Sequence, residues 1–213
     1  AFTFYYPENL ESLERLGASL VPISALENSE VPPVDVLYIG GGFPETHARA
    51  LAANRPLLAA ISAHARQGLP IYAECGGLML LSRAIRWQGQ RYPMAGVLPF
   101  QVEVCPTPQG HGYALLSVDR ENPFFPTGLA LRGHEFHYSR ILLEGDPLPT
   151  ACAVQRGIGC YQGRDGVLLG NVWAGYTHLH ALATPEWAAG LLRAARRFNQ
   201  QRARPSPESV FAG

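Results

Sequence analysis

Hydrophobic and polar positions in the first half of the chain alternate between a strand period and a helix period. Apolar and β-branched runs predict strands at residues 1–6, 18–23, 34–39 and 69–73. Leucines at helical spacing between Pro7 and Gly17 predict one helix, and two more are expected near residues 46–53 and 56–67. Strands that alternate with helices predict an α/β fold of the doubly wound type with a mostly parallel sheet.

The pattern changes after Gly96. Short strand-like segments punctuated by proline and glycine follow at residues 97–104, 113–118 and 151–155, and they predict an antiparallel extension of the sheet. A helix is expected at residues 185–198 and a loose tail at residues 201–213. We therefore expect one domain over residues 1–200, with functional groups at the carboxyl ends of its parallel strands.

The composition narrows the class of protein without naming a reaction. The chain has 213 residues, 47% hydrophobic and 16% charged, and 17 Lys and Arg balance 17 Asp and Glu. A net charge of zero with no run of like charges argues against a nucleic-acid or membrane-surface partner. No apolar run approaches the roughly 20 residues of a membrane span. The four cysteines have neither disulfide nor metal-site spacing, so we expect no metal and a reducing, cytoplasmic setting.

The strand at residues 69–73 leads to the most informative residue of the chain, Cys75. Two glycines, Gly76 and Gly77, follow it directly. A sharp turn from strand to helix exposes the residue at the turn, and it needs small neighbours because larger side chains would collide there. The next helix, expected over residues 78–85, would direct its first N–H groups at the sulfur and favour the thiolate. A buried structural cysteine is the alternative, but the glycine pair favours a nucleophile.

Histidine is the usual base for such a nucleophile. His178 and His180 stand at a predicted late strand end, where alternation places both on one face. One of them could reach Cys75, although two solvated histidines at a strand end would give the same pattern. Glycines 40–42 end another predicted strand and could offer backbone N–H groups to an oxyanion, or could simply form a tight turn.

A third cluster of chemically active residues lies at positions 133–139. It contains His134, Glu135, His137 and Tyr138. The spacing lacks the fixed partners of a zinc site. We interpret the cluster as a polar rim that holds a substrate or a partner domain.

Four motifs in this order resemble a single family. They are residues 38–45 (YIGGGFPE), 73–78 (AECGGL), 133–139 (GHEFHYS) and 176–180 (YTHLH). Together they are similar to the C-terminal half of cobyrinic acid a,c-diamide synthases. The resemblance implies a class I glutamine amidotransferase domain of the cobyric acid synthase type, with a flavodoxin-like fold.

The resemblance also implies roles for particular residues. Cys75 would attack the side-chain amide of glutamine, with His178 as general base and acid. Gly42 and Gly76 would supply the oxyanion N–H groups. Supporting, substrate or interface contacts would fall to Gly41, His180, His134, Glu135, His137 and Tyr138. Related amidotransferases carry a glutamate two residues after the histidine, where this chain has His180, so the group that orients His178 is left open.

A partner and its cofactors are implied outside this chain. An N-terminal ATP-binding synthetase domain of the dethiobiotin synthetase type would use ATP and magnesium to activate the a and c carboxylates of cobyrinic or hydrogenobyrinic acid. This chain contains no G-x-x-x-x-G-K-[ST] phosphate loop, so we expect that domain on a missing segment or a separate chain, and no cofactor here. The alternatives are a glutaminase for another tetrapyrrole, such as a sirohydrochlorin or sirohaem derivative, and a catalytically silent interaction module.

Overall fold

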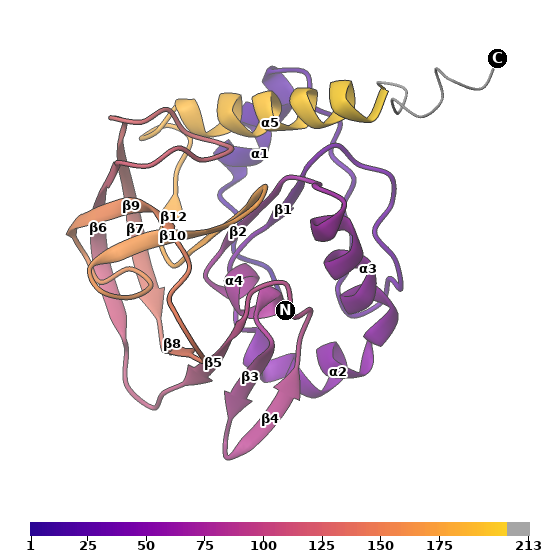
Figure 1. Ribbon diagram of the computed structural model, residues 1–213, viewed down its shortest axis with the longest axis vertical. Coiled ribbons are helices and arrows are strands. Elements are labelled where there is room, and N and C mark those ends of the chain that lie inside the picture. The colour runs from indigo at the N-terminus through magenta and orange to yellow at the C-terminus, as the bar shows by residue number, and fades with distance from the viewer. Residues whose placement is uncertain (204–213) are drawn as a thin grey trace.

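The computed structural model describes residues 1–203, in which helices cover both faces of the central strands of a large sheet (Figure 1). The helices are α1 (Pro7–Arg15), the 3₁₀ helix η1 (Pro44–His47), α2 (Ala48–Ala53), α3 (Arg55–Arg66), α4 (Gly76–Leu81) and α5 (Glu186–Ala203). The large sheet contains β1 (Leu37–Ile39), β2 (Ile71–Glu74), β6 (Gly110–Val118), β7 (Ala130–His137), β9 (Thr150–Arg156), β10 (Arg164–Leu169), β11 (Val172–Gly175) and β12 (His178–Leu179). A smaller sheet contains β3 (Ala84–Trp87), β4 (Gln90–Pro93), β5 (Phe100–Val104) and β8 (Ser139–Leu143).

The large sheet has the strand order β1-β2-β11-β10-β9-β6-β7-β12. Strand β2 pairs in parallel with β1 and β11, whereas the other five pairings of this sheet within residues 1–203 are antiparallel. The α/β class and the antiparallel extension are thus confirmed, but the parallel part is smaller than the sequence suggested. The carboxyl ends of β1, β2 and β11 meet at one edge, so the segments that follow them can form a common site.

Two of the expected strands are not formed, which explains the small parallel part. Residues 18–23 have no regular structure, and Leu20 and Val21 are 40% and 54% exposed. Residues 1–6 form only one antiparallel bridge, between Phe4 and Gly41. A short β-prone run becomes a strand only when a neighbouring strand and a buried face are available, and neither run finds both.

The smaller sheet corrects a second expectation. It has the order β4-β3-β5-β8, so the strand expected at residues 97–104 belongs to this sheet as β5 rather than extending the large one. The helix after the cysteine also ends early, at Leu81, because the Ser82 hydroxyl donates to the carbonyls of Met79 (2.7 Å) and Ala84 (3.1 Å) and turns the chain into β3. The strands expected at residues 113–118 and 151–155 are present within β6 and β9.

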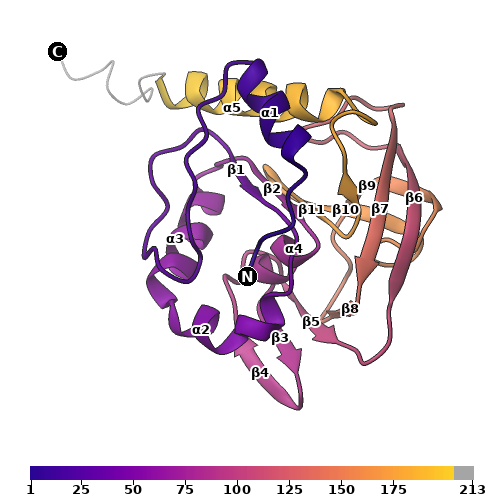
Figure 2. The same cartoon turned by 180° about the vertical axis from the view of Figure 1, so that it is seen from behind.

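The central strands β2 and β11 are fully buried, and Figures 1 and 2 show the covering helices from opposite sides. Ile71 and Ala73 of β2 belong to one hydrophobic cluster with side chains of α2, α3 and α4. Tyr72 faces the other cluster, where its ring stacks on Trp173 at 4.6 Å and contacts Trp187 of α5. Packing on both sides holds the end of β2 in a defined position.

The last helix is longer than expected. Helix α5 runs from Glu186 to Ala203, past the expected end at residue 198 and three residues past the expected domain boundary at residue 200. The rest of the expected tail, residues 204–213, lies outside the described residues. Within residues 1–203, no helix combines the length and the hydropathy needed to cross a bilayer.

Candidate active site

Cys75 occupies a strained turn between a buried strand and a helix, as the sequence predicts. It has φ 46° and ψ −96°, directly after β2 and at the N-cap of α4. Its N–H donates to the carbonyl of Gly175 at 2.7 Å, which ties the turn to the end of β11. A positive φ at a residue with a side chain costs about 1–3 kcal/mol, so the surrounding structure must hold Cys75 in this conformation.

The glycines after the cysteine are needed for close packing. A Cβ at Gly77 would lie 2.4 Å from the carbonyl oxygen of Ile39, and one at Gly76 would lie 3.1 Å from the backbone nitrogen of Gly42. The turn therefore packs directly against the loop after β1. This is the arrangement that exposes a nucleophile at the end of a strand.

His178 lies beside the cysteine. It is on β12, opposite His134 of β7, and its side chain is 5% exposed. Strand β11 pairs with β2, and only two residues separate β11 from β12. Because two residues span only a short distance, β12 begins close to the end of β2, although it pairs with β7 at the other end of the curled sheet. Burial lowers the pKa of His178, but hydrogen bonds with Cys75 and Glu74 outweigh this effect and raise the pKa to about 10. An imidazolium is thus favoured next to the sulfur.

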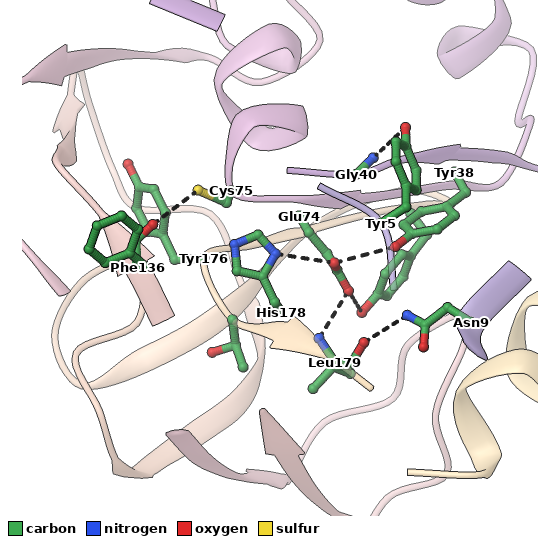
Figure 3. Close-up of polar contacts among 12 residues, drawn as sticks. Tyr5, Asn9, Tyr38, Gly40, Glu74, Cys75, Phe136, Tyr176, His178 and Leu179 are labelled. Atoms are coloured by element: carbon green, nitrogen blue, oxygen red, sulfur yellow. Dashed lines mark hydrogen bonds and ion pairs between the residues drawn. The ribbon is translucent and has the colours of Figure 1, made fainter. Parts of the chain in front are cut away.

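Glu74 is a site residue that the sequence analysis missed. Its Oε2 lies 3.4 Å from His178 Nδ1, and the residue is 1% exposed. Figure 3 shows the imidazole between this carboxylate and the side chain of Cys75. One signal could have pointed to Glu74. It ends a fully buried strand, and a buried glutamate needs a partner because Glu is almost never buried alone.

The glycine loop after β1 has one glycine, Gly41, whose backbone pairs with Phe4, and another, Gly42, whose N–H is unpaired within residues 1–203. The N–H of Gly41 donates to the carbonyl of Phe4 (3.2 Å), and Phe4 N–H donates to the Gly41 carbonyl (3.1 Å). A Cβ at Gly41 would lie 2.4 Å from His178 Cε1, so Gly41 makes room for the imidazole. Within residues 1–203, the N–H groups of Gly42 and Gly76 have no hydrogen-bond acceptor, and Gly42 lines the cleft beside Cys75.

A narrow cleft opens beside the sulfur. Its walls include Gly42, Glu45, Cys75, Met79, Tyr138 and Ser139. The thiol of Cys75 also lies 3.9 Å from the carbonyl oxygen of Phe136, whose ring is 38% exposed. Gly42, Cys75, His137 and Tyr138, all named in the sequence analysis, thus line one cleft, and Glu45 is an addition to them.

The cluster at residues 133–139 is only partly at the cleft. Glu135 points inward, where its carboxylate accepts hydrogen bonds from the N–H groups of Ile158 and Gly159, both at 2.9 Å, and from the Thr177 hydroxyl at 3.4 Å. Burial raises the pKa of this carboxyl group. Glu135 therefore braces the segment before His178 rather than forming the rim that the sequence suggested.

His137 and His134 take different positions in the same cluster. The ring of His137 stacks on Tyr176 at 3.8 Å, and its Nδ1 lies 2.8 Å from the Ser139 carbonyl oxygen. Burial lowers the pKa of His137, which favours the neutral ring. His134 is partly exposed, and burial likewise lowers its pKa. Both histidines flank the strand end that carries His178.

His180 faces a different neighbourhood from His178. Its Nε2 lies 3.5 Å from a carboxylate oxygen of Glu8, and its ring packs on Tyr6 with centroids 4.5 Å apart. The side chain is 28% exposed. His180 thus joins the end of the large sheet to α1, and His178 is the histidine beside the nucleophile.

The described part of the chain offers no obvious metal centre. Within residues 1–203, no group of three or more His, Cys, Asp or Glu side chains could hold a metal ion. The four cysteines are all unpaired thiols.

Comparison with solved structures identifies the fold. A structure titled glutamine amidotransferase superimposes with a TM-score of 0.64 at 20% identity, over 89% of this chain and 93% of that one. The structure of PurLQS from Thermotoga maritima superimposes with a TM-score of 0.63 at 18% identity, over 90% and 92%. The fold is that of the flavodoxin-like glutamine amidotransferases.

Sequence comparison then identifies the family. A family model described as the CobB/CobQ-like glutamine amidotransferase domain matches residues 1–186, and the chain belongs to this family. It is 45% identical over 193 residues to a cobyrinate a,c-diamide synthase of Magnetococcus marinus and 41% identical over 199 residues to that of Methanothermobacter thermautotrophicus. These alignments cover 91% and 93% of this chain but only 41% and 43% of the relatives, so the chain spans about two fifths of their length.

Proposed function

We propose that this chain is the glutaminase part of an ATP-dependent amidase that acts on cobyrinic or hydrogenobyrinic acid. The observation that carries the proposal is Cys75 in its strained turn, beside the buried His178 and open to a cleft. The acceptor is supported by the relatives, which are cobyrinate a,c-diamide synthases. The proposed compartment is the cytoplasm.

Hydrolysis would proceed in two halves. The thiolate of Cys75 attacks the side-chain carbonyl carbon of glutamine, and the free N–H groups of Gly42 and Gly76 stabilise the resulting oxyanion. His178 donates its proton to the leaving nitrogen, the C–N bond breaks, and ammonia departs. Water then attacks the γ-glutamyl thioester while His178 accepts one of its protons, and the C–S bond breaks. This releases glutamate and restores the thiolate beside the protonated His178. The second proton of the water passes to solvent, so glutamine and water give glutamate, ammonia and a proton.

The cleft also offers a partner for the α-ammonium group of glutamine. Glu45 lines the cleft with Cys75, is partly buried and has its pKa raised by that burial. Within residues 1–203 it forms no ion pair. A half-buried carboxylate without a cation favours a cationic ligand. We propose that Glu45 binds the α-ammonium group and so selects glutamine.

The remaining chemistry would belong to a partner. The chain has no phosphate-binding loop, so ATP and magnesium would bind to a synthetase domain or chain that activates the carboxylates. Ammonia from Cys75 would then complete the amide. The length of the relatives supports such a partner, since more than half of each lies outside the aligned region.

Substitution of Cys75 by Ala tests the proposal. With the synthetase partner present, C75A should lower the release of glutamate from glutamine by at least about 10⁴-fold, because the other three cysteines, all within residues 1–203, do not line the cleft. His178→Ala should also lower kcat strongly. Mass spectrometry of the wild-type chain mixed with glutamine should show a γ-glutamyl adduct on Cys75. Glutamine hydrolysis that persists in C75A would refute the mechanism.

A further inference from the structure

The carboxylate that faces His178 comes from an unusual place in the chain. Glu74 is the last residue of β2 and directly precedes the nucleophile. Its Oε2 is 3.4 Å from His178 Nδ1, and in Figure 3 the histidine lies between Glu74 and Cys75. One strand end therefore supplies the groups on both sides of the imidazole.

The other contacts of Glu74 are all with donors. The Tyr72 hydroxyl and the Leu179 N–H donate to Oε1 at 3.1 and 3.2 Å, and the Tyr38 hydroxyl lies 3.5 Å from Oε2. Burial, and after it the negative charge of Glu74, raise the pKa of Tyr38 and of Tyr72, so both hydroxyls keep their protons and donate. A set of donors without an acceptor suits an ionised carboxylate.

These contacts fix the carboxylate before any substrate binds. Tyr72 and Glu74 lie on the same face of β2, two residues apart, and the Tyr72 ring is clamped between its neighbours in the core. Leu179 follows His178 on β12, so the same carboxylate holds both the side chain of the histidine and the backbone next to it. Such a double hold fixes the position of the imidazole and its Nδ1 proton.

We propose that Glu74 is the positioning residue of the glutaminase site, and that it completes a Cys75, His178 and Glu74 triad in which the carboxylate directly precedes the nucleophile. The inference rests on the glutaminase function proposed above. Glu74 acts through His178: it holds Nδ1 so that Nε2 faces the sulfur, and its charge stabilises the imidazolium that protonates the leaving ammonia.

The surrounding charges allow a test by pH. The groups that face His178 are Glu74 and Cys75, which favour its proton, and His134 and His137 of β7, whose own pKa values His178 lowers. The pKa of about 10 means that His178 keeps its proton at neutral pH and loses it as the pH rises. Removing the charge of Glu74 must lower that pKa.

The first experiment replaces Glu74 by Gln, which keeps the size and removes the charge. With the synthetase partner present, E74Q should lower kcat for glutamine by about 10²-fold or more, with little change in KM. The alkaline limb of the pH profile of kcat/KM should shift to lower pH. Glu74→Asp, which keeps the charge, should recover part of kcat and move the limb back. An unshifted limb in folded E74Q would overturn the proposal.

The second histidine provides a matched control. His180 and Glu8 form the same kind of pair at 3.5 Å, but both side chains are partly exposed and lie away from the cysteine. E8Q should leave kcat and the pH profile unchanged. If E8Q lowered kcat as much as E74Q does, the effect would come from a general change of charge. The assignment of Glu74 as the positioning residue would then be overturned.

A second measurement does not require a substitution of Glu74. NMR titration of His178 in C75A removes the contribution of Cys75 to the pKa of the ring and leaves the Glu74 carboxylate beside it. The pKa of His178 should then stay above the ordinary 6.5, whereas burial alone would place it below. A pKa of His178 at or below 6.5 would refute the positioning role of Glu74. That result would not affect the glutaminase proposal, which depends on the loss of activity in C75A, so the two proposals can fail separately.

Discussion

At the scale of single residues, Glu45 is the acidic residue among those that line the cleft. The rest of the lining consists of neutral polar, aromatic and aliphatic side chains and of the residues that carry the chemistry. By the proposed contact with Glu45, a substrate with an ammonium group would gain a charge-assisted hydrogen bond of about 1.5–3 kcal/mol that an analogue without the amine cannot make.

We therefore expect Glu45→Gln to raise KM for glutamine by about 10-fold, because it removes one charged contact. Glutaramate, which is glutamine without its α-amino group, is the matched substrate. The wild type should prefer glutamine to glutaramate in kcat/KM, and E45Q should lose most of this preference. Steady-state kinetics on both substrates measure it. An equal preference in both proteins would show that Glu45 does not contact the amine.

At the scale of elements, the turn between β11 and β12 determines where His178 lies. The buried carboxylate of Asp165 accepts hydrogen bonds from the N–H groups of Tyr176 (3.0 Å) and Thr177 (3.1 Å), and also from Gly166 N–H (2.9 Å). Asp165 of β10 thus sets the turn that leads to His178, from 13 positions earlier in the chain.

Replacement of Asp165 by Ala should destabilise the protein by several kcal/mol. It leaves several buried N–H groups without acceptors, and each costs about 1–3 kcal/mol. Urea unfolding followed by tryptophan fluorescence measures the change. Asp119→Ala is the control: its carboxylate pairs with Arg164 at the surface, and such pairs contribute about 1 kcal/mol or less. Equal losses in the two variants would contradict the structural role of Asp165.

At the scale of the whole molecule, the chain is expected to work with a synthetase that consumes its ammonia. Phe43 and Phe136, which line the cleft, are 53% and 38% exposed, as expected of a mouth that a partner covers. Hydrolysis without the partner would release ammonia to solvent. The proposed coupling therefore favours a chain that is slow alone.

Adding the synthetase partner should raise kcat/KM for glutamine, as measured by glutamate release. In the same complex, C75A should lose amide formation from glutamine but keep amide formation from ammonium chloride, because free ammonia bypasses the cysteine. Full glutaminase activity of the isolated chain would argue against coupling. Loss of the ammonium-dependent reaction in C75A would show that this chain also takes part in the synthetase step.

The sequence by itself determined the fold class and the turn at Cys75, because these depend on local rules: period, glycine spacing and chain order. It predicted His178, Gly42 and Gly76 as site residues through the resemblance of four motifs to a known family. Only the tertiary structure decided the rest. Residues 18–23 have the composition of a strand but find no partner, and His180 turns to α1. Glu74 meets His178 across 104 positions of sequence. Such pairings depend on how the sheet curls, and no local pattern encodes that.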